Sequence, residues 1–314
     1  MKHLTIAFNG TNQWWKYLVL FLASLIGGQT VGAIPLIIVI LTKTLQGGVE
    51  KMPNPENMAD LSVFGIDPNF GLALMIFPFL VSLVILLLLI KPMHQRNYKT
   101  LFSGGSLIRW KRFFSAALIW TLLMAVYLFT DYSINPEDFS LNFNLGTFLV
   151  LLVVSLTLIP FQASYEEIMF RGYLAQGFAA WTKNRIMVIF FPAIIFGMLH
   201  IFNPEISEYG FWLTMPQYIL FGVIFGLVSV LDDGIELAMG AHTANNVFLS
   251  LFVTSKASAL QTPALFIQEN VDPLKDLLVM ILVGLLFIII VSLRYGFKYA
   301  VLYKKISVEA EIVQ

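Results

Sequence analysis

The stretch that decides the fold is LGTFLVLLVVSLTLIPFQASYEEIMFRGYL, residues 145–174. Its first seventeen residues, 145–161, carry no charge, and two adjacent carboxylates, Glu166 and Glu167, and then Arg171 follow. A charge-free run of this length approaches the roughly 20 residues that cross about 30 Å of hydrocarbon as a helix. The charges behind it are therefore either a solvated helix end at the membrane boundary or part of a functional site.

The composition indicates a membrane protein. Of the 314 residues, 58% are hydrophobic and 12% are charged, about half the charged fraction of an ordinary soluble domain. The absence of cysteine excludes disulfides, thiolate ligands and a thiol nucleophile. We predict an all-α fold, a polytopic membrane helix bundle of about eight transmembrane helices, from the charge-free stretches 17–41, 71–90, 113–130, 145–161, 186–202, 211–231, 237–253 and 277–293.

Most Lys and Arg residues are expected on one side of this bundle. With a cytoplasmic amino terminus, eight spans put 15 of the 19 Lys and Arg residues on the cytoplasmic side and twelve of the nineteen acids on the other. The positive-inside rule predicts such an asymmetry. We therefore expect a multi-pass integral membrane protein of a bacterial plasma membrane with both termini cytoplasmic. Because the same rule accounts for the basic cluster in 91–112, no nucleic-acid partner is predicted.

The chain divides into three parts. Residues 1–140 contain three spans without a polar pattern that suggests chemistry, residues 141–255 form the candidate catalytic core, and residues 256–314 contain the last span and a cytoplasmic tail. Ionisable side chains inside the core's spans are the informative residues, because each costs at least ~2.5 to 3.5 kcal/mol at the bilayer centre.

The two glutamates are expected to differ in role. Glu167 and Arg171 are four residues apart with the acid nearer the amino terminus, which favours an ion pair along a helix. The Glu166 side chain points about 100° around the helix from that pair. It is therefore free to interact with other groups.

Two histidines lie inside predicted spans. His200 ends the stretch FGMLH, with Phe196 one turn earlier, and His242 precedes Asn246 by four residues, so that these last two share a helix face. Each alone could simply bond to a neighbouring helix, a contact worth ~0.6 kcal/mol on average. Their occurrence beside the glutamate pair, in successive parts of one bundle, favours a shared site.

These residues resemble the three motifs of the CPBP family of intramembrane proteases, also called the Abi family, which includes the type II CAAX prenyl endopeptidases. EEIMFR at 166–171 matches Glu-Glu-x-x-x-Arg, FGMLH at 196–200 matches Phe-x-x-x-His, and HTANN at 242–246 matches His-x-x-x-Asn/Asp. Order and internal spacing follow the family without departure, and the resemblance covers about 145–253.

The resemblance implies a glutamate-dependent hydrolase that cuts peptide bonds in a cavity open to the cytoplasm. By position, Glu166 with His200 would activate a water molecule. His242 with Asn246 would stabilise the oxyanion. The remaining matched side chains would support the site: Glu167, Arg171 and Phe196.

A metal site is the alternative. Glu166, His200 and His242 supply a carboxylate and two imidazoles that suit zinc, and members of the family have often been labelled metallopeptidases. The sequence lacks a His-Glu-x-x-His helix, and a mechanism without metal uses every matched residue. We therefore expect no cofactor, with zinc as the alternative.

The predicted depths of these residues disagree. Glu166 lies at the membrane surface, whereas a rise of 1.5 Å per residue puts His242 ~8 Å deep and His200 ~21 Å deep. Either the helix that carries Glu166 continues to about residue 181, or the span that carries His200 begins after 186; a water-filled cavity would admit polar residues at such depth. Three further acids lie in a short turn that we expect to be solvated: Asp232, Asp233 and Glu236.

Three functions are compatible with these patterns. The first is an intramembrane endopeptidase whose substrate is a peptide or membrane protein at the lipid bilayer. The second is a non-catalytic immunity factor or scaffold of the same fold. The third is a small-solute transporter, which the absence of paired repeats with broken helices disfavours.

Overall fold

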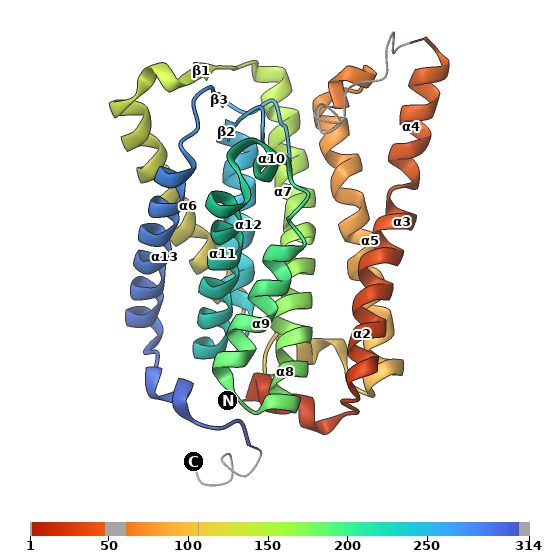
Figure 1. Cartoon of the computed structure of the whole chain (residues 1–314), viewed down its shortest axis with the longest axis vertical. Coiled ribbons are helices and arrows are strands. Elements are labelled where there is room, and N and C mark those ends of the chain that lie inside the picture. The colour runs from red at the N-terminus through yellow and green to blue at the C-terminus, as the bar shows by residue number, and fades with distance from the viewer. Residues whose placement is uncertain (1, 48–60, 106, 308–314) are drawn as a thin grey trace.

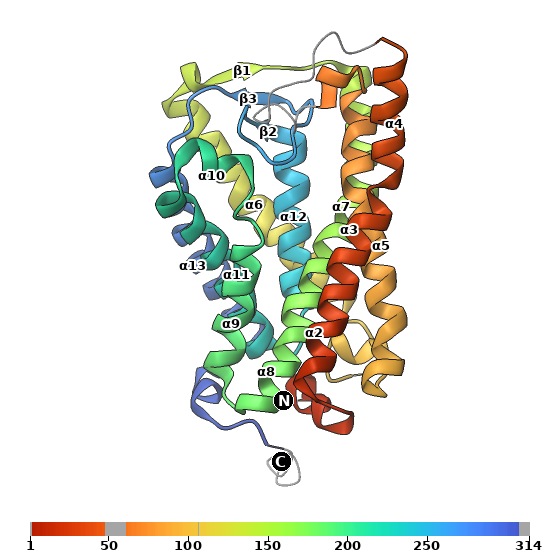
Figure 2. The same cartoon turned by 45° about the vertical axis from the view of Figure 1, so that its right-hand side comes forward.

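The computed structural model describes residues 2–47, 61–105 and 107–307, and the last residues of the predicted tail, 308–314, lie outside this range. A helix lies in each of the eight predicted spans, although the helix in 186–202 ends at Met198. The long helices run beside one another along the long axis of the molecule, and both termini lie at the same end (Figures 1 and 2). The fold is thus the all-α bundle expected from the sequence.

The first long rod, Trp14–Leu45, consists of α2 (Trp14–Leu22), the π-helix η2 (Ala23–Gly27), α3 (Gly28–Gly32) and α4 (Ile34–Leu45). The other long helices are α5 (Pro68–His94), α6 (Trp110–Ile134), α7 (Leu145–Glu167) continued by the π-helix η7 (Ile168–Leu174) and α8 (Ala175–Thr182), α9 (Arg185–Met198), α11 (Phe211–Asp232), α12 (Glu236–Phe252) and α13 (Pro273–Tyr295).

Short elements cover the two ends of the bundle. At the end with the termini lie α1 (Lys2–Thr5), η1 (Ile6–Asn9), η5 (Tyr98–Leu101) and η8 (Tyr299–Tyr303), and elsewhere are η4 (Leu61–Phe64), η6 (Pro136–Asp138) and α10 (Pro204–Tyr209). A small sheet closes the opposite end, where β1 (Phe139–Leu141) pairs antiparallel with β3 (Phe266–Gln268) and β2 (Val253–Thr254) pairs parallel with β3.

Polar residues begin several of these helices. Asp67, Asn144, Asn184 and Asp272 stand immediately before α5, α7, α9 and α13, and each side chain accepts hydrogen bonds from the first free backbone N–H groups. Capping of this kind satisfies donors that the helix itself cannot pair. The apolar runs therefore start as helices at defined residues.

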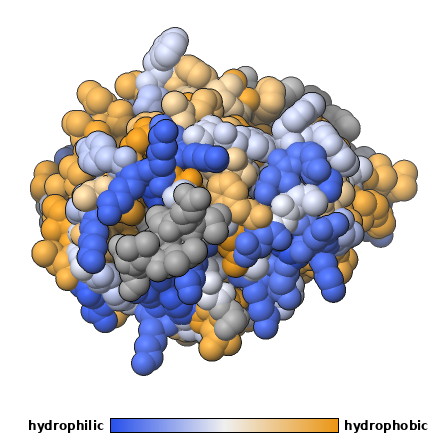
Figure 3. Space-filling view, turned by 90° about the horizontal axis from the view of Figure 1, so that it is seen from below, coloured by the Kyte–Doolittle hydropathy of each residue, from blue (hydrophilic) through white to orange (hydrophobic). Residues whose placement is uncertain are grey.

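The outer surface of the bundle suits a bilayer. Six helices among the described residues are long and apolar enough to cross a membrane, and α9 is a shorter apolar helix of 14 residues. The outer face of α6, for example, exposes Leu118, Leu122, Val126 and Phe129. Viewed from the end that holds the termini, hydrophilic residues gather over the face and hydrophobic residues line much of the rim (Figure 3). The protein is an integral membrane protein, and the side on which its termini lie stays a prediction.

The helix that carries the two glutamates is much longer than the charge-free run that predicted it. It continues without interruption from Leu145 to Thr182, with the π-helical segment beginning directly after Glu167. The helix therefore continues past residue 181, as the first explanation proposed, and Glu166 lies well inside it; the depth of Glu166 in the bilayer stays a prediction. The second is wrong, since α9 begins at Arg185 and ends at Met198, and His200 lies in the turn that follows.

Three helices pack closely around the middle of the bundle. The contacts of α12 with α6 and α7 are among the most extensive in the described structure. At Gly240 a Cβ atom would lie 2.1 Å from the carbonyl oxygen of Phe113, so only glycine admits this approach of α12 to α6. Trp120 of α6 is fully buried beside Phe225 and Phe287, with ring centroids 5.3 and 5.1 Å away. This packing fixes the positions from which α12 presents its polar residues.

The turn between α11 and α12 is not the solvated connection expected from the sequence. Arg109 Nη2 lies 2.9 Å from Asp232 and 2.5 Å from Glu236, and Arg112 Nη1 lies 2.5 Å from Asp232. Both acids are buried, which is possible because two arginines at the start of α6 neutralise them. We call these four residues the end cluster: Arg109, Arg112, Asp232 and Glu236.

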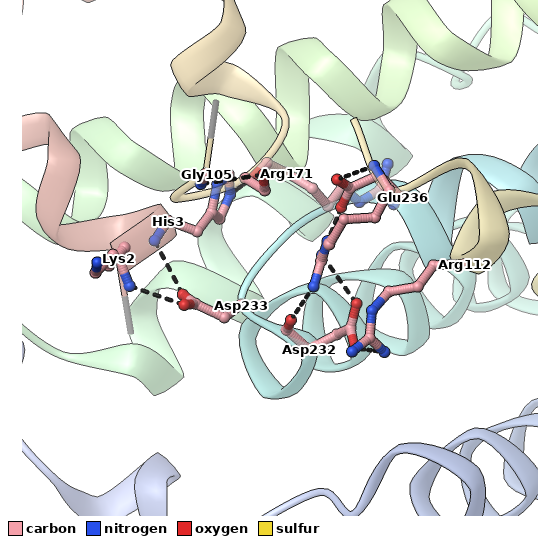
Figure 4. A network of polar contacts seen from close by, with 10 residues as sticks. Lys2, His3, Gly105, Arg112, Arg171, Asp232, Asp233 and Glu236 are labelled. Atoms are coloured by element: carbon pink, nitrogen blue, oxygen red, sulfur yellow. Dashed lines mark hydrogen bonds and ion pairs between the residues drawn. The ribbon is translucent and has the colours of Figure 1, made fainter. Parts of the chain in front are cut away.

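The amino terminus is anchored beside the end cluster (Figure 4). The backbone N–H groups of Lys2 and His3 donate to the carboxylate of Asp233 over 2.8 and 2.9 Å. The His3 ring is buried and its Nε2 lies 3.1 Å from the backbone carbonyl oxygen of Arg171 in η7. The first residues of the chain thereby contact the helix that carries the glutamates.

Candidate active site

Four ionisable side chains meet between α7, η7 and α12 in the middle of the bundle, and we call them the central cluster: Glu166, Glu167, Arg171 and His242. Glu167 Oε1 accepts hydrogen bonds from Arg171 Nη1 over 2.8 Å and from His242 Nδ1 over 2.7 Å. The Glu167 side chain is 0% exposed and that of Arg171 is 2% exposed. Glu167 therefore holds an arginine and a histidine together and has no access to a substrate.

Glu166 occupies a more open position in the same cluster. Its Oε2 lies 3.3 Å from His242 Nε2, and its Oε1 accepts a hydrogen bond from Gln162 Nε2 over 2.9 Å. The Glu166 side chain is 9% exposed. The roles expected from the sequence agree with this geometry, because the arginine pairs with Glu167 and the neighbouring carboxylate is the more exposed of the two.

His242 is thus flanked by two carboxylates. Both ring nitrogens face carboxylate oxygens, which only accept hydrogen bonds when ionised. With both nitrogens protonated, the ring would donate on each side, and the central cluster would then carry two positive and two negative charges. A neutral sum is favourable for groups buried among apolar helices.

Gln162 connects Glu166 to Asn246, and sequence reasoning missed it. Asn246 Nδ2 donates to Gln162 Oε1 over 2.9 Å, so that Gln162 stands between the first and third motifs. It lies one turn before Glu166 on α7 and is buried. The available signal was a polar amide four residues from Glu166, which places the two side chains on one helix face.

His200 lies beside the central cluster but makes its own contacts. Its Nδ1 lies 2.8 Å from the carbonyl oxygen of Phe196, and its ring stacks on Tyr218 with centroids 4.3 Å apart. None of the hydrogen bonds in the described residues joins His200 directly to Glu166, although the two groups interact electrostatically. Asn203 Nδ2 donates to the Tyr218 hydroxyl over 2.9 Å, which holds that ring in place.

Aromatic rings enclose the side chains of Arg171 and His242. The Arg171 guanidinium lies 4.7 Å from the Phe196 ring centroid, which is within reach of a cation–π interaction. The His242 ring lies 4.9 Å from the ring of Phe221 and 5.7 Å from that of Phe225. Phe196 therefore belongs to the site through contacts with the arginine, as well as with His200 at 4.6 Å.

The residues suggested as zinc ligands do not form a ready ligand set. Within the described part of the chain, no group of three or more His, Cys, Asp and Glu side chains is arranged to hold a metal ion. A zinc ion on His242 would compete with the carboxylates that already face both ring nitrogens, whereas a zinc-ligating histidine normally directs only its second nitrogen to such a partner.

The structure brings most of the predicted residues together. Glu166, Glu167, Arg171 and His242 are in direct contact, Asn246 joins them through Gln162, and Phe196 and His200 lie against the same group. Side chains from α7, η7, α9 and α12 meet here, although the three sequence motifs span eighty-one residues, 166–246.

Two comparisons bear on this arrangement. Residues 144–248 match the model of the type II CAAX prenyl endopeptidase Rce1-like family, and this segment contains every residue of the central cluster. The chain is also 31% identical over 280 residues to the uncharacterized protein YyaK of Bacillus subtilis strain 168, an alignment that covers 88% of this chain and 91% of the relative. No solved structure matches the chain significantly.

The segment that matches the family model contains all three motifs. The chain belongs to the type II CAAX prenyl endopeptidase Rce1-like family.

Proposed function

We propose that this protein is an intramembrane endopeptidase that hydrolyses a peptide bond of a membrane-associated substrate. The observation that carries the proposal is the contact between Glu166, the more accessible of two adjacent buried glutamates, and His242 inside a bundle of apolar helices. A persistent group of ionisable side chains at such depth is costly and is by default a functional site.

Glu166 is the proposed general base. It takes a proton from a water molecule while the water oxygen attacks the scissile carbonyl carbon. Its carboxylate is held from both sides, by Gln162 at Oε1 and by His242 at Oε2. General-base catalysis by a positioned side chain contributes about 10² to 10⁴ in rate.

His200 assists in orienting the water. Its Nδ1 must donate to the Phe196 carbonyl oxygen, because a carbonyl oxygen only accepts. In the neutral ring Nε2 is then unprotonated and can accept a hydrogen bond from water. This assignment gives His200 and Glu166 complementary roles on one water molecule.

Asn246 is the proposed oxyanion donor. One hydrogen of its Nδ2 group is directed to Gln162, which leaves the other for the oxygen of the tetrahedral intermediate. One such donor is worth about 2.7 to 4 kcal/mol of transition-state stabilisation. When the intermediate collapses, the carbon–nitrogen bond breaks and Glu166 returns its proton to the leaving amine.

The partners of His242 favour a role in orientation over the oxyanion role suggested by the resemblance. Both of its ring nitrogens face carboxylates. In the proposed mechanism His242 therefore holds the Glu166 carboxylate in place and balances its charge.

The direct test is cleavage of a library of peptides and membrane-protein segments by protein purified into lipid nanodiscs. The wild type is expected to cut at least one member, and Glu166→Gln is expected to lower kcat/KM by at least a hundredfold. Glu208→Gln is the matched control, because Glu208 lies exposed on α10. Equal cleavage by all three proteins would refute the proposed base.

A non-catalytic immunity factor or scaffold makes the opposite prediction. Its biological effect in cells would survive Glu166→Gln, provided that the variant is produced in normal amounts. Survival of that effect, together with no cleavage by the wild type, would favour this alternative.

A further inference from the structure

Five buried or half-buried polar side chains form one continuous line through the middle of the bundle. Trp120 Nε1 donates to Asn245 Oδ1 over 3.2 Å, and Asn245 Nδ2 donates to Asn246 Oδ1 over 3.0 Å. Asn246 Nδ2 donates to Gln162 Oε1 over 2.9 Å, and Gln162 Nε2 donates to Glu166 Oε1 over 2.9 Å. The line starts on α6, passes through α12 and ends on α7 at the proposed base.

The direction of every hydrogen bond in this line is determined at both ends. An indole N–H can only donate, so Asn245 must present its oxygen to Trp120. At the other end an ionised carboxylate can only accept, so Gln162 must present its NH₂ group to Glu166. The two asparagines between them then have one orientation that satisfies all neighbours. Both ends require the same orientation.

This directionality matters at Asn246. Its amide has an oxygen and an NH₂ group of nearly the same size, and only the NH₂ group can stabilise an oxyanion. Asn245 holds the oxygen of Asn246, so the NH₂ group faces Gln162 and the proposed site. Without the Trp120 N–H, the Asn245 amide could rotate, and Asn246 would keep only the constraint that Gln162 imposes from the other end.

Packing fixes the indole that starts the line. Trp120 is 0% exposed, and its ring contacts Phe221, Phe225 and Phe287 with centroids 6.1, 5.3 and 5.1 Å away. A ring enclosed in this way cannot turn its N–H elsewhere. The aromatic packing of α6, α11 and α13 therefore determines the direction of a polar group near the reaction site.

We propose that Trp120, Asn245 and Gln162 are positioning residues that orient the Asn246 amide and the Glu166 carboxylate for catalysis. Their assignment as positioning residues rests on the proposed proteolytic function, whereas the existence of a coupled line does not. The three act through their neighbours and touch no substrate.

The test is a double-mutant cycle with Trp120→Phe and Gln162→Leu. Phenylalanine keeps the buried ring and removes the N–H, and leucine keeps most of the volume of glutamine. Trp120 and Gln162 make no direct contact with each other in this line of hydrogen bonds, because two asparagines lie between them. Changes at sites that share no partners normally add, so coupling between these two would report the line itself.

Two quantities are measured for the wild type, both single variants and the double variant. In thermal unfolding in nanodiscs, the fall in Tm of the double variant is expected to be smaller than the sum of the two single falls. In peptide cleavage, each single variant is expected to lower kcat about tenfold or more, with KM within about twofold of the wild type. The kcat of the double variant is expected to be at most about threefold below that of the less active single variant.

The matched control is Trp110→Phe, on the same helix but with the tryptophan 53% exposed, which is expected to leave kcat unchanged. Additive falls in Tm would overturn the coupled line whether or not the protein cleaves peptides. Coupled falls in Tm with no cleavage by the wild type would keep the line and remove the proposed function. Coupled falls with unchanged kcat would overturn the positioning role.

Discussion

The central cluster in the middle of the bundle and the end cluster near both termini both bury charge, but they pair their carboxylates differently. In the end cluster two arginines face two acids, and the arginine side chains remain 29% and 26% exposed. In the central cluster Arg171 is 2% exposed and is bound to Glu167 alone among the acids, which leaves Glu166 beside a histidine and an amide.

The difference separates charge that supports the fold from charge available for chemistry. At the end cluster both carboxylates are committed to arginines at the start of α6, and water can still reach the cations. At the central cluster the fold supplies one arginine for two glutamates. The second glutamate is therefore held by a histidine and an amide, and none of the described arginines pairs with it, which leaves its carboxylate available as a general base.

Breaking the buried pair in the central cluster should have the largest effect on stability. Glu167→Gln leaves Arg171 as an uncompensated charge in a site that water does not reach, so we expect a loss of about 3 to 5 kcal/mol in the free energy of unfolding. SDS titration in mixed micelles measures it. Adding Arg171→Met to this variant should restore part of the loss, and a purely additive result would contradict the pairing.

Breaking the end cluster should cost less and should spare catalysis. In Glu236→Gln, Arg109 keeps Asp232 as a partner and remains partly solvated, so we expect a loss of about 1 to 3 kcal/mol. Below the unfolding temperature, kcat/KM should stay within about twofold of the wild type in the same peptide assay. A hundredfold fall in the folded variant would show that the two clusters are not functionally distinct.

The anchored amino terminus should add a smaller, pH-dependent effect near the end cluster. Burial lowers the pKa of His3, although its bond to the Arg171 carbonyl and the charge of Asp233 act in the opposite direction. Below about pH 6.5 the unfolded chain therefore binds a proton that folded His3 does not, and stability falls as the pH falls.

The comparison is between the wild type and His3→Gln, because the two proteins share every other titratable group. From pH 7.5 to 5.5 the wild type should lose about 1 kcal/mol more than the variant. Identical losses in the two proteins would mean that His3 takes up a proton in the folded state.

Metal removal should have the smallest effect. His242 already directs both ring nitrogens to carboxylates, so cleavage after treatment with 1,10-phenanthroline or EDTA should stay within about twofold of the untreated rate. Loss of activity that added zinc restores would instead support the ligand set Glu166, His200 and His242.

The helices could be predicted from hydropathy, but the depth of the site could not. Charge-free runs located all eight long helices. The run 145–161 nevertheless ended too early, because hydropathy treats Glu167 and Arg171 as two exposed charges. Inside the bundle they neutralise each other, and the helix continues for twenty-one residues beyond residue 161, to Thr182. The same limitation made Asp232 and Glu236 look solvated, since their arginines lie over a hundred residues earlier.

The motif residues of the site could be named from the sequence, whereas the residues that orient them could not. Spacing of four residues identified the pair of Glu167 and Arg171. Trp120 and Asn245 gave no such signal, because a tryptophan and an asparagine inside apolar helices are more often packing residues. Their link to Glu166 depends on how α6 and α12 pack, and the close approach at Gly240 sets that packing.

Single-turnover cleavage in ¹⁸O-labelled water tests most directly whether Glu166 acts on water or on the substrate itself. With enzyme in excess over peptide, the account predicts one ¹⁸O atom in the new carboxyl group of the product and none in the Glu166 side chain, as read by mass spectrometry of both. Label in the Glu166 carboxylate would mean that this residue attacks the peptide carbonyl and forms a covalent intermediate, which would contradict the role of general base.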